Sequence, residues 1–185
     1  MSTKTKIFID GSEGTTGLRI LERFEGRDDI ELIPIASELR KDPTEVKKKI
    51  NESDITFLCL PDAASIEAVS YIENPNVRII DASTAHRTNP DWSYGFPELS
   101  SAHRESIKNS KRVSVPGCYA SGFNAIVYPL MQAGLITKDA LITCAAISGY
   151  SGAGKKAIAQ YQDTDARAIG KTNGDAHDPL CSPRQ

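Results

Sequence analysis

A cysteine at the start of an expected helix is the residue in this sequence best suited to covalent chemistry. Cys118 follows Val115-Pro116-Gly117 and precedes an apolar stripe at helical spacing. The free N–H groups and the dipole of a helix N-terminus stabilise a thiolate, which is the nucleophilic form of cysteine. Such a thiolate can attack an acyl carbon and form a thioester. The alternative is that Cys118 is a small buried residue at a tight turn.

The other three cysteines have a different setting. Cys59 and Cys144 lie inside apolar runs that read as strands, so we expect inert core thiols there, and Cys181 lies near the end of the chain. No C-x-x-C pair occurs, which argues against a zinc site and against a disulfide framework. We therefore expect reduced, intracellular thiols and no bound metal.

A glycine-rich segment after the first expected strand predicts a dinucleotide site. Asp10 is followed by the spacing G-x-x-G-x-x-G, and a helical pattern begins at once. Glycines in this context allow a tight turn, a close approach of backbone to a pyrophosphate, and close packing of helix on strand. A plain glycine-rich turn is the alternative. The candidate cofactor-binding residues are Gly11, Ser12, Glu13, Gly14, Thr15, Thr16 and Gly17.

The end of the second expected strand favours NADP over NAD. An NAD site usually has an Asp or Glu here for the ribose 2′-hydroxyl. This sequence has Ser37 at that position, with Arg40 and Lys41 just beyond. A hydroxyl and two cations attract a 2′-phosphate, which a carboxylate repels. If the register is off by one, Glu38 takes the acid position, and an ordinary solvated turn also remains possible.

A second glycine-rich loop, 148–156, follows the last apolar run. It has the glycine spacing of a phosphate-binding P-loop, but Lys156 stands where that motif needs Ser or Thr. Its backbone N–H groups, with Lys155, are candidates to hold a substrate or cofactor phosphate. Ser151 and Gly152 are the cofactor-binding candidates within it.

The elements that position these residues alternate between strand and helix. This order predicts an α/β fold with a doubly wound, mostly parallel sheet. Pro34 predicts an edge position for the second strand or the end of that strand, and Asp42 and Asp62 read as helix caps. Strands are expected at 7–9, 30–35, 55–60, 77–80, 113–115 and 141–147, and helices at 15–24, 43–50, 63–72, 102–108 and from 118 to the stop at Gly134.

Composition excludes several classes of protein. The 185 residues contain 22 Lys and Arg against 24 Asp and Glu, so no basic excess points to nucleic acid. No apolar stretch approaches the roughly 18 residues of a membrane span, and the N-terminus lacks the apolar core of a signal peptide. We expect a cytoplasmic protein without nucleic-acid or membrane partners.

Five segments in order resemble one enzyme family. They are 10–17, Asp81 to Arg87, 94–99, 115–119 and 148–155, and the resemblance runs from about Lys6 to Tyr161. The segments look like those of N-acetyl-gamma-glutamyl-phosphate reductase, in particular its shorter subclass. Related semialdehyde dehydrogenases share the architecture, but their nucleophile segment does not usually read Pro-Gly-Cys-Tyr.

The resemblance implies an NADPH-dependent oxidoreductase of arginine biosynthesis. It would reduce a small-molecule acyl phosphate, N-acetylglutamyl 5-phosphate, to the semialdehyde and phosphate. By similarity Cys118 is the catalytic nucleophile. The full-length family also implies a homo-oligomer. Further residues assigned by similarity are Cys59, Leu60 and Pro61 beside the cofactor, and Ser83, His86 and Arg87 beside the substrate.

The match also predicts a domain organisation. Residues 1–115 would form a Rossmann-like NADP-binding domain, 116–163 the start of a second, catalytic α/β domain, and 164–185 a divergent, loosely ordered tail. The family's His-x-Pro-Glu-like segment has no counterpart here, and His177 does not match it. The chain therefore looks truncated or divergent after about Thr164. A non-catalytic NADP-binding fragment and a related semialdehyde dehydrogenase remain alternatives.

Overall fold

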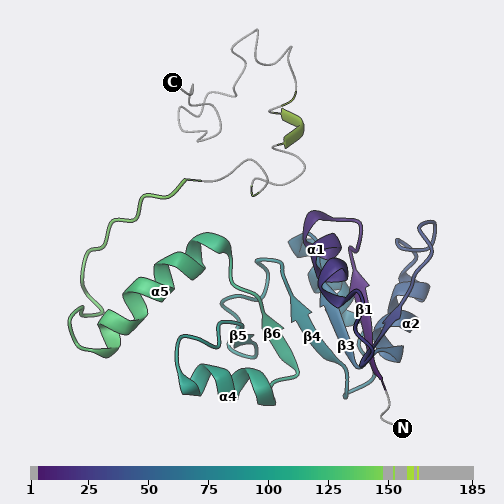
Figure 1. Cartoon of the computed structure of the whole chain (residues 1–185), viewed down its shortest axis with the longest axis horizontal. Coiled ribbons are helices and arrows are strands. Elements are labelled where there is room, and N and C mark those ends of the chain that lie inside the picture. The colour runs from purple at the N-terminus through teal and green to yellow at the C-terminus, as the bar shows by residue number, and fades with distance from the viewer. Residues whose placement is uncertain (1–3, 148–151, 153–157, 161, 163–185) are drawn as a thin grey trace. The chain divides into compact units, whose positions relative to one another are not determined.

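The computed structural model describes residues 4–147, 152, 158–160 and 162 (Figure 1). Six strands form one sheet in the order β2-β1-β3-β4-β6-β5, and every neighbouring pair is parallel. The predicted α/β fold with a parallel sheet is confirmed. The strands are β1 (Thr5–Asp10), β2 (Ile30–Ile33), β3 (Ile55–Leu58), β4 (Arg78–Asp81), β5 (Ser93–Tyr94) and β6 (Arg112–Ser114).

Five helices connect or follow these strands. They are α1 (Thr15–Phe24), α2 (Pro43–Glu52), α3 (Asp62–Ser70), α4 (Ser101–Asn109) and α5 (Cys118–Gln132). Asp42 caps α2 as predicted, since its side chain accepts a hydrogen bond from the Thr44 N–H. The cap prediction for Asp62 is wrong, because α3 begins at Asp62 itself after Pro61. None of the described helices is long and apolar enough to cross a membrane.

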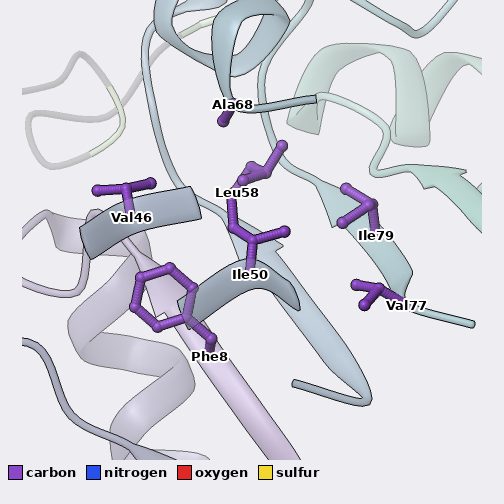
Figure 2. Packing of buried hydrophobic residues seen from close by; sticks show 7 residues of the cluster. All are labelled: Phe8, Val46, Ile50, Leu58, Ala68, Val77 and Ile79. Atoms are coloured by element: carbon purple, nitrogen blue, oxygen red, sulfur yellow. The ribbon is translucent and has the colours of Figure 1, made fainter. Parts of the chain in front are cut away.

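Helices cover both faces of the sheet because side chains alternate along each strand. On one face, Phe8, Leu58 and Ile79 pack with Val46 and Ile50 of α2, and Ala68 of α3 and Val77 complete this core (Figure 2). On the other face, the Phe57 ring lies 5.6 Å from the Phe24 ring of α1. Coverage of both faces explains the continuous apolar runs at 7–9 in β1 and 57–58 in β3.

The two edge strands of the sheet are β2 and β5. β2 is an edge strand, as Pro34 predicted, and it ends at Ile33. β5 has only two residues and was missed, because such a short strand leaves no period in the sequence. It pairs with β6 and forms the other edge of the sheet.

The predicted strand at 141–147 is wrong. The chain divides into two compact units, one up to Ala140 and one from Leu141 onward. Residues 141–147 are neither helix nor strand, and Leu141 and Ile147 are 102% and 91% exposed. An apolar run becomes a strand only when a neighbour pairs with its N–H and C=O groups. No described strand pairs with residues 141–147.

The turn from β1 to α1 generates a stability prediction. A Cβ at Gly17 would lie 2.4 Å from the Gly11 carbonyl oxygen and 2.6 Å from Ser12 Cα, both parts of the backbone. We expect Gly17→Ala to destabilise the fold by about 1–3 kcal/mol, because overpacking forces the backbone to move. Urea unfolding measures the change.

Gly122→Ala is the matched control. Gly122 is also helical, and a Cβ there meets nothing within 4 Å. It should be neutral or stabilising by up to about 1 kcal/mol, from helix propensity. Equal effects of the two substitutions would contradict the packing argument.

Candidate active site

The candidate residues in the first unit gather at the carboxyl-terminal end of the sheet. In a parallel sheet the carboxyl ends of all strands lie at the same end of the sheet, where α/β proteins bind their ligands. β1 leads into the glycine-rich loop, β2 toward Ser37, β3 into Cys59, β4 into Ser83 and β6 into Cys118. Topology alone therefore brings the segments that follow β1, β3, β4 and β6 to the same end of the sheet (Figure 1).

The glycine-rich loop has the geometry that a dinucleotide requires. Gly11 has a φ of +83°, a conformation that favours glycine, and a Cβ there would lie 2.4 Å from the Cys59 carbonyl oxygen. Gly14 is the N-cap of α1 and offers no capping side chain. The first-turn N–H groups of α1 have no acceptors within the helix, so this end is suited to a phosphate. The residues present fit the pyrophosphate of a dinucleotide.

Glu13 connects this loop with the end of β2. The Ser37 hydroxyl donates to one Glu13 carboxylate oxygen at 3.0 Å, and the Arg40 guanidinium forms an ion pair with the other. Lys41 and Glu38 are exposed. The structure thus brings Ser37 and Arg40 together, as a shared 2′-phosphate site requires, with an internal carboxylate between them.

Buried Asp10 and partly buried Cys59 lie beside the loop. The Cys59 N–H donates to the Asp10 carbonyl oxygen at 2.8 Å. Burial raises the pKa of the Asp10 carboxyl to about 6, against a smaller opposing effect of its hydrogen bond from Gly11. Burial, together with the charges of Asp10 and Asp81, raises the pKa of the Cys59 thiol to about 11. The Cys59 thiol therefore stays protonated near pH 7. The prediction that Cys59 is a core strand residue is wrong, because it follows the end of β3 and is only partly buried.

Buried Asp81 organises the loop after β4. Its carboxylate accepts hydrogen bonds from the Ser65 hydroxyl (3.0 Å), from the Ser83 N–H (2.9 Å) and hydroxyl (2.6 Å), and from His86 Nδ1 (2.6 Å). The His86 ring also stacks on Trp92, with centroids 4.0 Å apart. Ser83 and His86 are only 6% and 7% exposed. Both side chains are directed at Asp81, and their contact with substrate stays a prediction.

Arg87 connects the same loop to the segment before Cys118. Its Nε donates to the Val115 carbonyl oxygen at 2.9 Å, and one Nη donates to the Ala82 carbonyl oxygen at 3.1 Å. The other, Nη1, lies 2.7 Å from where a Cβ on Gly117 would stand. Arg87 therefore holds a guanidinium edge beside the residue that precedes the candidate nucleophile.

Cys118 is the first residue of α5, with Gly117 as the N-cap, and its side chain is exposed. The predicted position at a helix N-terminus is confirmed. α5 is held against β5 by a hydrogen bond of 3.1 Å from the Asn124 amide to the Tyr94 hydroxyl. The thiol is thus exposed at the carboxyl-terminal end of the sheet, at the start of a helix that a hydrogen bond joins to β5.

The remaining candidates lie in the second unit. Ser151 lies outside the described residues, and Gly152 is exposed. The prediction that Cys144 is a buried strand residue is wrong: it is exposed, because the strand expected around it does not form. Within the described part of the chain, no group of three His, Cys, Asp or Glu side chains could hold a metal ion.

Sequence reasoning gave no role to Asp81, although it opens one of the recognised segments. The available signal was an acid at the end of an apolar strand, with Ser and His two and five residues later. A buried carboxylate needs several donors, and those residues supply them. Asp62 was read only as a cap, whereas its carboxylate accepts from the Thr84 N–H at 2.8 Å and from the Thr84 hydroxyl.

Comparison with known proteins agrees with this geometry. Residues 6–110 match the model of the semialdehyde dehydrogenase NAD-binding domain, and residues 118–171 match that of the semialdehyde dehydrogenase dimerisation domain. Among solved structures, aspartate semialdehyde dehydrogenase from Francisella tularensis is similar, with a TM-score of 0.61 and 16% sequence identity. The match covers 94% of this chain and 52% of the chain of that enzyme. At that identity the likeness shows the fold alone. The chain belongs to the semialdehyde dehydrogenase family.

Curated relatives narrow the family further. N-acetyl-gamma-glutamyl-phosphate reductase of Burkholderia lata is 51% identical over 160 residues, which are 86% of this chain and 51% of the relative. The enzyme of that name from Trichormus variabilis is 51% identical over 170 residues, 92% of this chain and 53% of its own. The resemblance to N-acetyl-gamma-glutamyl-phosphate reductases is confirmed. The chain spans about half the length of these relatives.

Asp10 predicts a pH dependence of stability. Its pKa rises from 3.8 to about 6 on folding. Between these values the folded protein binds more protons than the unfolded chain, so this group lowers the free energy of unfolding as pH rises through that window. Two pKa units correspond to about 3 kcal/mol. Asp10→Asn should therefore gain stability over the parent between pH 4 and pH 7, approaching about that amount.

Urea titrations at several pH values measure this difference. Asp139→Asn provides the control, because it makes the same substitution at an exposed position and should change the free energy of unfolding clearly less. A pH-independent effect of Asp10→Asn would show that the Asp10 carboxyl is not desolvated in the folded state.

The three described cysteines predict an order of alkylation. At pH 7 iodoacetamide should modify Cys118 first, Cys144 next and Cys59 last. Cys118 and Cys144 are both exposed, but only Cys118 begins a helix, whereas Cys59 is a thiol with a pKa of about 11. Peptide mass mapping over time reads out the order, and labelling in urea should remove the differences. Earlier labelling of Cys59, or equal rates for Cys118 and Cys144, would refute this assignment.

Proposed function

We propose that this chain provides the cofactor site and the nucleophile for the NADPH-dependent reduction of N-acetylglutamyl 5-phosphate to N-acetylglutamate 5-semialdehyde and phosphate. The observation that carries the proposal is the position of Cys118 at the start of α5. This position lies at the same carboxyl-terminal end of the sheet as the glycine-rich loop. The names of the curated relatives support the substrate.

The cofactor side rests on three features. Gly11, Gly14 and the N-terminus of α1 would hold the pyrophosphate, and Ser37 with Arg40 would receive a 2′-phosphate. Lys41 adds a third donor nearby in the sequence. Bound NADPH would supply the hydride. The same residues favour NADP(H) over NAD(H), because Ser37 rather than an acid takes the expected position after β2.

On the substrate side, the Cys118 thiolate would attack the acyl carbon, form a thioester and release phosphate. The N–H groups in the first turn of α5 are suited to stabilise the developing oxyanion, an effect worth about 3–4 kcal/mol per donor in measured cases. Arg87 Nη1, beside Gly117, is placed to attract the phosphate of the substrate. Ser83 and His86 would lie beside the substrate, on a loop whose path is held by their hydrogen bonds to Asp81.

A second candidate function is a dinucleotide-binding protein without turnover. The observation that favours it is that both described histidines have other partners: His86 binds Asp81, and His103 Nδ1 forms a hydrogen bond of 2.8 Å with the Ser100 hydroxyl. Neither is thus held for Cys118 as an acid or base. Loss of general acid–base catalysis costs about 10²- to 10⁴-fold. In this second function the chain would bind the cofactor and form no acyl group on Cys118.

Acylation separates the two functions. Mixed with the acyl phosphate, the chain should gain one acyl group on Cys118, detected by intact mass and peptide mapping, with release of one phosphate. Adding NADPH should then give a single burst of cofactor oxidation with little steady turnover. Cys118→Ala should abolish both signals, while Cys144→Ala, which removes the other exposed thiol of the described chain, should keep them.

Two outcomes would contradict the proposal. Absence of acylation in the parent chain, with NADPH still bound, would support the non-catalytic function. Acylation that survives Cys118→Ala would mean that another thiol is the nucleophile.

A further inference from the structure

Glu13 occupies the two side chains that the proposed function assigns to the 2′-phosphate. Its two carboxylate oxygens are used separately, one by the Ser37 hydroxyl and one by the Arg40 guanidinium. These donors come from the segment after β2, whereas Glu13 comes from the loop after β1. A carboxylate and a phosphate are both anions that bind Arg and hydroxyl donors. One pair of donors therefore has two competing acceptors.

We propose that Glu13 is a specificity-determining residue that sets the affinity for the 2′-phosphate by competing with it. The inference rests on the proposed function, in that the chain binds NADP(H) through the glycine-rich loop. Before the nucleotide arrives, Glu13 keeps Ser37 and Arg40 together. When a 2′-phosphate binds, the carboxylate gives up these donors and still repels the phosphate from nearby. A nucleotide without the 2′-phosphate does not need this exchange.

The arrangement allows the exchange to occur at the surface. The side chains of Arg40 and Glu13 are 44% and 52% exposed, and Ser37 is exposed as well. Solvent can reach all three groups, so a phosphate can approach them without opening the core. Glu13 lies between Gly11 and Gly14, so the loop that would hold the pyrophosphate also carries the competitor.

The opposite role for Glu13 makes a different prediction. If its carboxylate accepted the ribose hydroxyls of a nucleotide without a 2′-phosphate, it would replace the acid missing at the end of β2. Removing its charge would then weaken such nucleotides. Competition predicts that removing the charge strengthens only nucleotides that carry the 2′-phosphate.

The test is calorimetric titration of the full chain with adenosine 2′,5′-bisphosphate and with 5′-AMP. Glu13→Gln should bind the bisphosphate about five- to tenfold more tightly than the parent, as expected for loss of one nearby charge at partly screened distance. Its affinity for 5′-AMP should stay within about twofold, because that ligand does not meet the Ser37–Arg40 pair. Glu38→Gln is the matched control: it removes the same charge from an exposed position one residue from Ser37, and should have a clearly smaller effect.

Arg40→Gln gives a second, independent reading if Glu13→Gln disturbs the loop. It should weaken bisphosphate binding at least about fivefold, and in the double variant the gain from Glu13→Gln should shrink, since the contested donor is gone. Thermal unfolding of each variant checks that the fold is kept.

The outcomes separate the inference from the proposed function. If the parent chain binds NADPH but Glu13→Gln leaves bisphosphate affinity unchanged or weaker, the competition is refuted while NADP binding stands. A loss of 5′-AMP affinity in Glu13→Gln would instead make Glu13 a ribose ligand. If neither the parent nor any variant binds NADPH or the bisphosphate, both the proposed cofactor and the inference fail.

Discussion

The buried carboxylate of Asp81 is the constraint on which the arrangement of the candidate site depends. A carboxylate at 0% exposure is costly unless donors surround it. Ser65, Ser83 and His86 provide those donors, and meeting this requirement fixes the path of the loop after β4. The Asp81 backbone carbonyl also accepts from the Val115 N–H at 2.7 Å, which extends the β4–β6 pairing toward Cys118. One residue therefore sets the positions of two loops.

The two halves of the site are joined by the start of α3. This helix follows Cys59, which packs against the glycine-rich loop, and its own Asp62 and Ser65 bind the loop after β4. Arg87 then continues the connection to the segment before Cys118. A continuous set of hydrogen bonds and backbone contacts thus runs from the glycine-rich loop to the segment before Cys118. Such a frame suits a reaction in which a cofactor and a thiol must act on the same carbon.

Local patterns predicted the residues whose roles depend on backbone geometry. Gly11 and Gly17 were identified from spacing, because a tight turn and a close approach leave a mark in the sequence. Side-chain partners were not predictable in this way: nothing in the sequence shows that Glu13 reaches Ser37, since the contact depends on two loops from neighbouring strands. The failed strand around Cys144 has the same cause. A strand is completed by its neighbour, and an apolar run cannot show whether a neighbour is there.

The central claim is that the carboxyl-terminal end of the sheet binds the nucleotide and presents the nucleophile. Amide chemical-shift mapping of the isotope-labelled chain during titration with NADPH tests it most directly. The account predicts shifts at Gly11 to Gly17, at Ser37 and Arg40, and around Cys59, with further shifts at the start of α5 near Cys118. Shifts confined to the amino-terminal end of the sheet would contradict a shared site. Strong shifts around the glycine-rich loop with none near Cys118 would contradict it as well.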